Sequence, residues 1–165
     1  ISDVPGSGWA DFGSPWNDTY TCADGKHITI CPLEPQFYAL LMEKLGLTDD
    51  PVFADQWDKS QWPEGKRRIA ALVASKTRDE WNELLEGTDA CYAPVLDLTE
   101  AANHPHNVAR GTFLNVDGVV QPAPAPRFSR SEPRVGACPV PGEHTRDIIA
   151  EFGLDPAALQ ESGAV

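Results

Sequence analysis

The spacing of apolar and polar residues predicts a β-hairpin near the beginning of the chain. Tyr20 alternates with polar neighbours in the first half of residues 18–30, and residues 27–30 fit a returning strand. Between these halves stands Asp24-Gly25, a pair typical of tight turns because both residue types tolerate positive φ angles. We therefore expect two antiparallel strands joined by a short turn.

Helical periodicity follows this hairpin. One apolar face runs through residues 34–45, and Gly46 suits the C-terminal cap of that helix. Its apolar positions are Phe37, Leu40, Leu41 and Leu45. Residues 63–75 predict a second helix, and Thr77 with Glu80 predicts a capping box that begins a third.

Shorter strands and helices are expected in the rest of the chain. Residues 90–96 predict a buried strand, which Pro94 assigns to a sheet edge or a bulge. Asp117-Gly118 predicts the turn of a second hairpin over residues 113–120. The other expected elements are a helix at 98–103, an extended proline-rich stretch at 121–141, a helix at 142–152 and a short helix at 155–159. Because strands and helices do not alternate regularly, the predicted fold class is α+β.

Three parts are expected along the chain. Residues 1–17, rich in Gly, Ser, Pro and Trp, predict a linker that docks on another surface. The aromatic residues available for this docking are Trp9, Phe12 and Trp16. Residues 18–121 predict a small α+β domain with hairpin strands and several helices. Residues 122–165 predict a proline-rich return segment and C-terminal helices.

Composition and charge exclude several classes of function. The net charge of −12 argues against nucleic-acid binding, because an acidic surface repels phosphate backbones. No apolar run has the length of a membrane span and no leader peptide is visible, so we expect no membrane association and a cytoplasmic location. The four cysteines form no CxxC pair and are expected to be reduced thiols. Since the chain begins with Ile1, we expect a fragment of a longer protein.

Two short clusters of basic or metal-ligating residues are candidates for binding sites. The basic run Lys66, Arg67 and Arg68 fits either a solvated helix face or a contact for an anionic ligand such as a CoA phosphate. His104-Pro105-His106 has the composition of a metal pair, but the proline is expected to keep the segment from being helical, so the rings need not converge. We expect no metal site, and the residues alone supply no complete catalytic constellation.

Glu34 is the most suggestive single residue. It stands where the predicted strand gives way to a helix, next to Pro35, and the helix dipole favours a carboxylate at that position. Two interpretations stay open. The carboxylate caps the helix, or it orients a histidine supplied from elsewhere.

Several strings together resemble one family. They lie at residues 18–20, 23–26, 33–38, 76–81, 87–91, 93–96, 100–101, 104–106, 110–111, 122–129 and 142–145. Their order and spacing resemble the C-terminal half of α-methylacyl-CoA racemases, in the class III CoA-transferase superfamily. The resemblance extends from about residue 8 to about residue 160, and Glu-Pro-Gln-Phe-Tyr at residues 34–38 points to the racemase branch.

The resemblance implies a fold and a reaction. Members of the family are interlocked homodimers of chains with a large and a small domain, and they invert the α-carbon of 2-methylacyl-CoA thioesters by proton transfer. The resemblance implies no cofactor, because coenzyme A is part of the substrate. Glu34 matches the carboxylate that supports the catalytic histidine of the other subunit, while Leu33 and Asn17 would lie along the acyl path. The catalytic His and Asp belong to the family's N-terminal half and match no string here, so the isolated chain is expected to be inactive.

Two alternatives to the racemase stay open. The chain could be the same region of a family III CoA-transferase, in which an N-terminal Asp forms covalent intermediates. It could also be a non-catalytic dimerisation module. Cys31-Pro32 and Asn17 depart from the racemase pattern near the implied acyl path, which leaves room for another acyl-CoA substrate.

Overall fold

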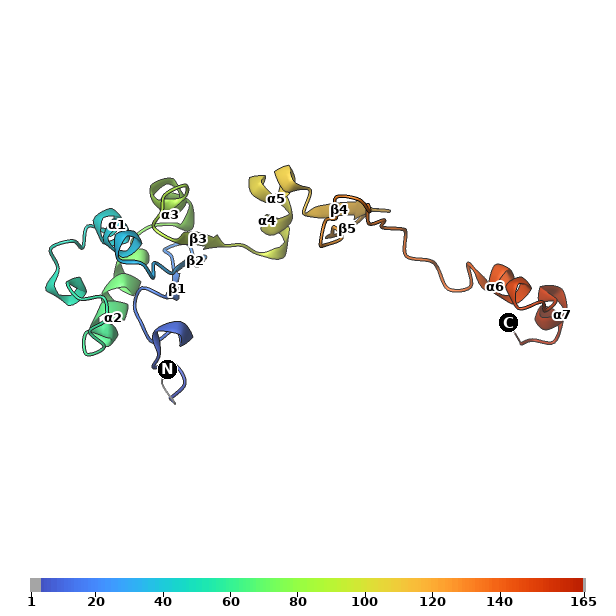
Figure 1. Cartoon of the computed structure of the whole chain (residues 1–165), viewed down its shortest axis with the longest axis horizontal. Coiled ribbons are helices and arrows are strands. Elements are labelled where there is room, and N and C mark those ends of the chain that lie inside the picture. The colour runs from blue at the N-terminus through green and yellow to red at the C-terminus, as the bar shows by residue number, and fades with distance from the viewer. Residues whose placement is uncertain (1–3, 165) are drawn as a thin grey trace. The chain divides into compact units, whose positions relative to one another are not determined.

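The structure, a computed structural model, describes residues 4–164 and divides into two compact units, Ile1–Asp97 and Leu98–Val165. Figure 1 shows the elements of both units, which are described one at a time below. Short antiparallel sheets and separate helices make up the chain, so the predicted α+β class is confirmed. The predicted boundaries at residues 17 and 121 stay predictions.

The first unit is built on a three-stranded antiparallel sheet in the order β1-β2-β3. Its strands are β1 (Asp18–Thr21), β2 (His27–Ile30) and β3 (Tyr92–Val95). The first hairpin is confirmed, although its loop is longer than predicted: the Cys22 N–H donates to the Lys26 carbonyl at 2.8 Å, and Gly25 has the positive φ of 77°. Pro94 lies on the edge strand as predicted. The prediction that this strand is buried was wrong, because its residues alternate between half-buried and exposed.

Three helices pack around this sheet (Figure 1). They are α1 (Pro35–Leu45), α2 (Trp62–Val73) and α3 (Arg78–Leu85), and two short 3-10 turns lie at Trp9–Asp11 and Pro51–Phe53. The capping box of α3 and the Gly46 cap of α1 are confirmed.

The buried face of α1 is turned from the predicted one. Its buried residues are Tyr38, Leu41, Met42 and Leu45, whereas Phe37 and Leu40 are only half-buried. Tyr38 turns inward because its hydroxyl donates to the Phe53 carbonyl at 2.9 Å, so its polar end is satisfied within the core.

Trp16, in the segment predicted to be a docking linker, packs into the core of the first unit. Trp16 is 0% exposed, and its indole N–H donates to the Gln56 carbonyl at 3.0 Å. Trp9 stacks on it with ring centroids 6.0 Å apart, while Phe12 stays largely exposed. The segment has the composition of a linker, yet a large apolar ring gains more from burial in the core of its own unit than from exposure to water.

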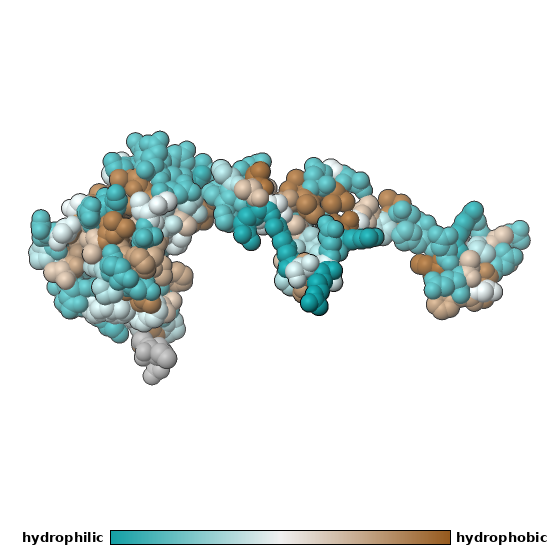
Figure 2. All heavy atoms as spheres, turned by 45° about the horizontal axis from the view of Figure 1, so that its top comes forward, coloured by the Kyte–Doolittle hydropathy of each residue, from teal (hydrophilic) through white to brown (hydrophobic). Residues whose placement is uncertain are grey.

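The second unit contains four helices and one two-stranded sheet among its described residues. They are α4 (Leu98–Asn103), α5 (Pro105–Arg110), β4 (Phe113–Val116), β5 (Val119–Pro122), α6 (Thr145–Glu151) and α7 (Pro156–Glu161). The second hairpin is confirmed, with φ angles of 51° at Asp117 and 85° at Gly118. Figure 2 shows apolar side chains at the surface of this hairpin, where Val119 and Val120 are exposed. No helix within residues 4–164 is long and apolar enough to cross a bilayer.

Candidate functional site

Glu34 lies at the surface, between the end of β2 and the first turn of α1. Its backbone is extended, with φ −75° and ψ 142°, and Pro35 occupies the first helical position. Within the described part of the chain, the Glu34 side chain forms no capping hydrogen bond. The hydrogen bond that the capping interpretation requires is therefore not formed, and the carboxylate is exposed at the positive end of the helix dipole.

The backbone before Glu34 is anchored by a buried side chain, Gln56. The Gln56 amide donates to the carbonyls of Pro32 at 2.9 Å and Leu33 at 3.2 Å, and the residue is 7% exposed. The Gln56 backbone carbonyl accepts in turn from the indole N–H groups of Trp16 and Trp62, at 3.0 and 3.1 Å. The position of Glu34 is thus set by the core of the first unit. Sequence reasoning missed Gln56, since nothing in its local pattern points to partners more than twenty residues away.

Two cysteines lie beside Glu34. The Cys31 N–H donates to the Cys91 carbonyl at 2.9 Å, which extends the pairing of β2 with β3 by one residue. Partial burial raises the pKa of the Cys91 thiol, and the negative charges of Glu34, Cys31 and Asp89 raise it further. Glu34 and Cys31 therefore lie close enough to Cys91 to act electrostatically on its thiol.

The other predicted site residues lie at the same end of the sheet. Leu33 is half-buried against the core, directly before Glu34. Asn17 directly precedes β1, whose first residue, Asp18, pairs with Ile30 at the end of β2. The Asn17 amide donates to the Trp9 carbonyl at 2.7 Å, so it holds the N-terminal segment in place. Chain topology thus gathers Asn17, Leu33 and Glu34, but Asn17 is already engaged within the fold.

Carboxylates already engage the basic run of α2. Lys66 pairs with Asp18 at 2.5 Å, and Arg68 pairs with Asp50 at 2.5 Å. Arg67 pairs with Glu64 at 2.6 Å, and hydrogen bonds from Arg67 and Arg68 lower the pKa of Glu64 to about 2. This arrangement favours the solvated helix face over the contact for an anionic ligand.

The histidine pair takes a different conformation from the predicted loop. Pro105 occupies the first position of α5 and His104 its N-cap, so His106 is helical. Proline is compatible with a helix start, because its missing N–H has no intrahelical partner there. Among residues 4–164, no group of three or more His, Cys, Asp and Glu side chains is arranged to hold a metal ion.

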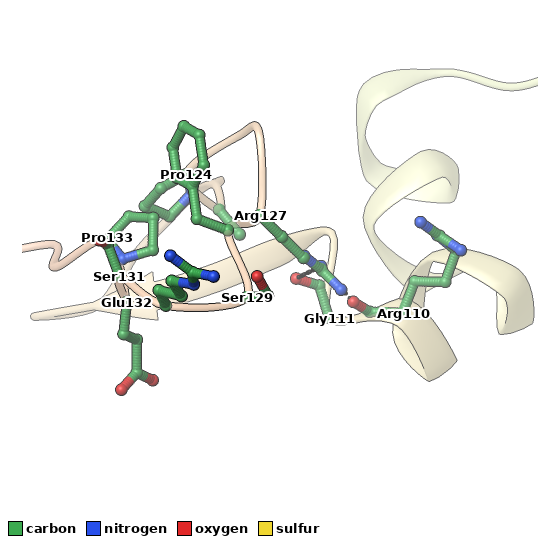
Figure 3. Close-up of a pocket in the computed structure, with 11 residues that line it drawn as sticks. Arg110, Gly111, Pro124, Arg127, Ser129, Ser131, Glu132 and Pro133 are labelled. Atoms are coloured by element: carbon green, nitrogen blue, oxygen red, sulfur yellow. Dashed lines mark hydrogen bonds between the residues drawn. The ribbon is translucent and has the colours of Figure 1, made fainter.

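The second unit has a cleft of its own, of about 580 Å³. Figure 3 shows Arg127 directed at the backbone of Arg110 and Gly111, and its guanidinium donates to both carbonyls, at 2.9 Å to Gly111. The Arg110 side chain and the Glu132 carboxylate point away from this contact (Figure 3). Arg127 thus fastens the proline-rich segment to the end of α5, which is a structural role.

Comparison with known proteins identifies the family. The profile described as CoA-transferase family III matches residues 2–145. The chain is 41% identical over 148 residues to the alpha-methylacyl-CoA racemase of Mus musculus, covering 87% of this chain and 38% of that protein. It is 40% identical over 152 residues to the racemase of the same name from Homo sapiens, covering 90% of this chain and 40% of that protein. The chain therefore spans about two fifths of the length of these relatives.

A solved structure supports the same assignment at the level of the fold. The hypothetical protein Rv3272 from Mycobacterium tuberculosis matches with a TM-score of 0.64 and 24% sequence identity, over 79% of this chain and 38% of that chain. Sequence and fold agree, and the chain belongs to CoA-transferase family III.

Proposed function

We propose that this chain serves in an α-methylacyl-CoA racemase-like enzyme that inverts the carbon next to the thioester carbonyl of 2-methylacyl-CoA. The observation that carries this proposal is the identity of 40–41% to two curated racemases over most of the chain. The enzyme acts as an interlocked homodimer in the cytoplasm. It needs no cofactor, since coenzyme A arrives as part of the substrate.

In this proposal Glu34 is a positioning residue. Its carboxylate is exposed, makes no capping bond, and is carried by backbone that Gln56 ties to the core. It would accept a hydrogen bond from the catalytic imidazole of the other subunit, which fixes the tautomer of the ring and raises its basicity. Leu33, adjacent to Glu34, would line the acyl path.

The residues that exchange the α-proton are placed outside this chain. Racemisation requires a base on one face of the carbon, an acid on the other, and stabilisation of the enolate oxygen. We assign these roles to a His and an Asp in the part of the relatives that this chain does not span. The isolated chain is therefore expected to show no exchange of the α-proton of 2-methylacyl-CoA with deuterated water, measured by mass spectrometry at several protein concentrations. Exchange that rises in proportion to this chain would contradict the assignment.

The role of Glu34 is tested by Glu34→Gln in the full-length protein. Loss of a carboxylate that supports a catalytic histidine typically costs about 10–100-fold in activity, and we expect turnover to fall by that factor. The acidic limb of the pH profile of kcat/KM should also move to lower pH, because an imidazolium without its carboxylate has a lower pKa. Glu43→Gln, on the same helix and exposed, is the matched control. Unchanged turnover and pH profile in Glu34→Gln would reduce Glu34 to a surface residue.

The family itself provides a second candidate, a CoA-transferase. A transferase passes CoA from one acyl group to another through a covalent carboxylate intermediate and does not need the histidine. Exchange and transfer are therefore measured side by side on the full-length protein. Exchange without transfer supports the racemase, whereas transfer without exchange assigns the chain to a CoA-transferase and removes the proposed partner of Glu34.

A further inference from the structure

Cys31 and Cys91 face each other across two neighbouring strands. The antiparallel register of β2 and β3 pairs Ile30 with Tyr92, so the next opposed pair is Cys31 and Cys91. The hydrogen bond of 2.9 Å from the Cys31 N–H to the Cys91 carbonyl confirms that the pairing continues to these residues. Opposed residues of antiparallel strands have Cα atoms about 4.5–5.5 Å apart, within the range of roughly 4.4–6.8 Å that a disulfide spans.

Both cysteines are exposed just beyond the paired ends of β2 and β3, and the charge of Cys31 acts on the Cys91 thiol. Residues two apart along a strand share a face, and directly opposed residues on neighbouring strands share a face as well. Ile28 and Ile30 point into the core at 1% exposure each, so Cys31 lies on the opposite face with His27. Ala93 and Val95 are exposed on β3, and Cys91 directly precedes that strand with a positive φ of 49°. Both cysteines are exposed and reduced in the structure, which leaves them open to oxidants from solution.

We propose that Cys31 and Cys91 form a reversible redox site that closes into a cross-strand disulfide when it meets a peroxide. The Cys31 thiolate attacks one oxygen of hydrogen peroxide and breaks the O–O bond, which gives a sulfenic acid and a hydroxide that takes up the proton lost by the thiol and becomes water. The second thiol then attacks the sulfenic sulfur, forms the S–S bond and releases a second water. Two thiols are oxidised and one peroxide is reduced to two waters, so the step balances with no other reactant.

A disulfide at this position would restrain the backbone next to Glu34. Cys31 is three residues before Glu34, and the negative charge of Glu34 acts on Cys91. A covalent bond here would fix the backbone that leads into α1 to the edge strand of the sheet. This inference rests on the register of the strands and is independent of the proposed role of Glu34.

The test is peptide mapping of the purified chain after treatment with hydrogen peroxide, without reductant. Trypsin should release residues 27–44 with Cys31 as the sole cysteine and residues 79–110 with Cys91 as the sole cysteine. We expect these two peptides to be joined, lighter than their sum by two hydrogen atoms, and separated again by dithiothreitol. Separate sulfinic acids on Cys31 and Cys91, with no joined pair, would overturn the proposal.

Three controls separate a cysteine pair held together by the fold from general thiol reactivity. Cys138→Ser removes another exposed cysteine and should leave the joined pair unchanged. Cys31→Ser should abolish the joined pair, and Cys91 should then accumulate a mixed disulfide when oxidised glutathione is added. Oxidation of the urea-unfolded chain should scramble the pairing to include Cys22 and Cys138. The proposal is overturned if the unfolded chain yields as large a share of the Cys31–Cys91 pair as the folded chain.

Discussion

At the scale of single residues, Gln56 holds the backbone that carries the candidate site. Its side-chain amide donates hydrogen bonds to the two consecutive carbonyls before Glu34, and its backbone carbonyl accepts hydrogen bonds from two indole N–H groups. A buried amide with these contacts links the tryptophan-rich part of the core to the position of the exposed carboxylate.

Gln56→Ala is therefore expected to destabilise the first unit. The variant leaves the carbonyls of Pro32 and Leu33 without their partner, and an unsatisfied buried polar group costs about 1–3 kcal/mol. Urea unfolding followed by tryptophan fluorescence measures this loss. Gln36→Ala, on the exposed part of α1, is the control and should change the free energy of unfolding by less than about 0.5 kcal/mol. Equal effects of the two substitutions would contradict the anchoring role of Gln56.

Only some residues of the candidate site could be predicted from the sequence. Glu34 could be singled out because a carboxylate at a strand-to-helix junction is a local pattern. Gln56 could not, because its role depends on partners more than twenty residues distant that only the folded chain brings near. Cys31 departs from the racemase pattern in the sequence alone, but its place opposite Cys91 depends on the register of strands that are far apart in sequence.

At the scale of elements, local chemistry predicted the turns and caps well. Asp117-Gly118 adopts two positive φ angles, and Thr77 and Glu80 exchange both bonds of the capping box. These features depend on residues within four positions of one another. The buried face of α1 and the exposure of β3 depend on which neighbours arrive by tertiary packing, so periodicity alone placed them incorrectly.

Thr77→Ala tests the capping box directly. The Thr77 hydroxyl accepts from the Glu80 N–H at 3.3 Å, and the Glu80 carboxylate accepts from the Thr77 N–H at 2.7 Å. Replacing an N-cap threonine by alanine typically costs about 1 kcal/mol of stability. We expect that loss in urea unfolding, compared with Thr48→Ala at an exposed turn. A Thr77→Ala chain as stable as the control would show that α3 is held by packing alone.

At the scale of the whole molecule, the hydrophobic core belongs to the first unit. The clustered core residues extend from Trp16 to Ala90, and Trp16 and Trp81 are the largest side chains that are fully buried. The sequence predicted a domain of residues 18–121, which would leave Trp16 outside. The composition of residues 1–17 predicts a linker. The burial of Trp16 could not be predicted from it, because Trp16 hydrogen-bonds to the Gln56 carbonyl, which also accepts from Trp62.

Truncated chains can distinguish the observed first unit, which ends at Asp97, from the predicted domain of residues 18–121. Residues 1–97 should fold alone and unfold in urea at the same midpoint as the whole chain. Residues 18–121 should be less stable by about 3–5 kcal/mol, the usual cost of removing a buried tryptophan side chain. Circular dichroism against urea concentration measures both. Equal stability of the two pieces would favour the boundaries predicted from sequence.

The close packing of three indoles should be visible in circular dichroism. They belong to Trp9, Trp16 and Trp57. Trp9 lies nearly parallel to Trp16, at 18°, and Trp57 meets Trp16 edge-on with centroids 5.0 Å apart. Chromophores this close couple their electronic transitions, so the group should give an exciton couplet in far-ultraviolet circular dichroism that separate tryptophans lack. Because Trp9 stands in the N-terminal segment and Trp57 follows Gln56, the couplet reports the docking of that segment independently of helix content. Stopped-flow detection at this band would show whether the segment docks together with the sheet or after it.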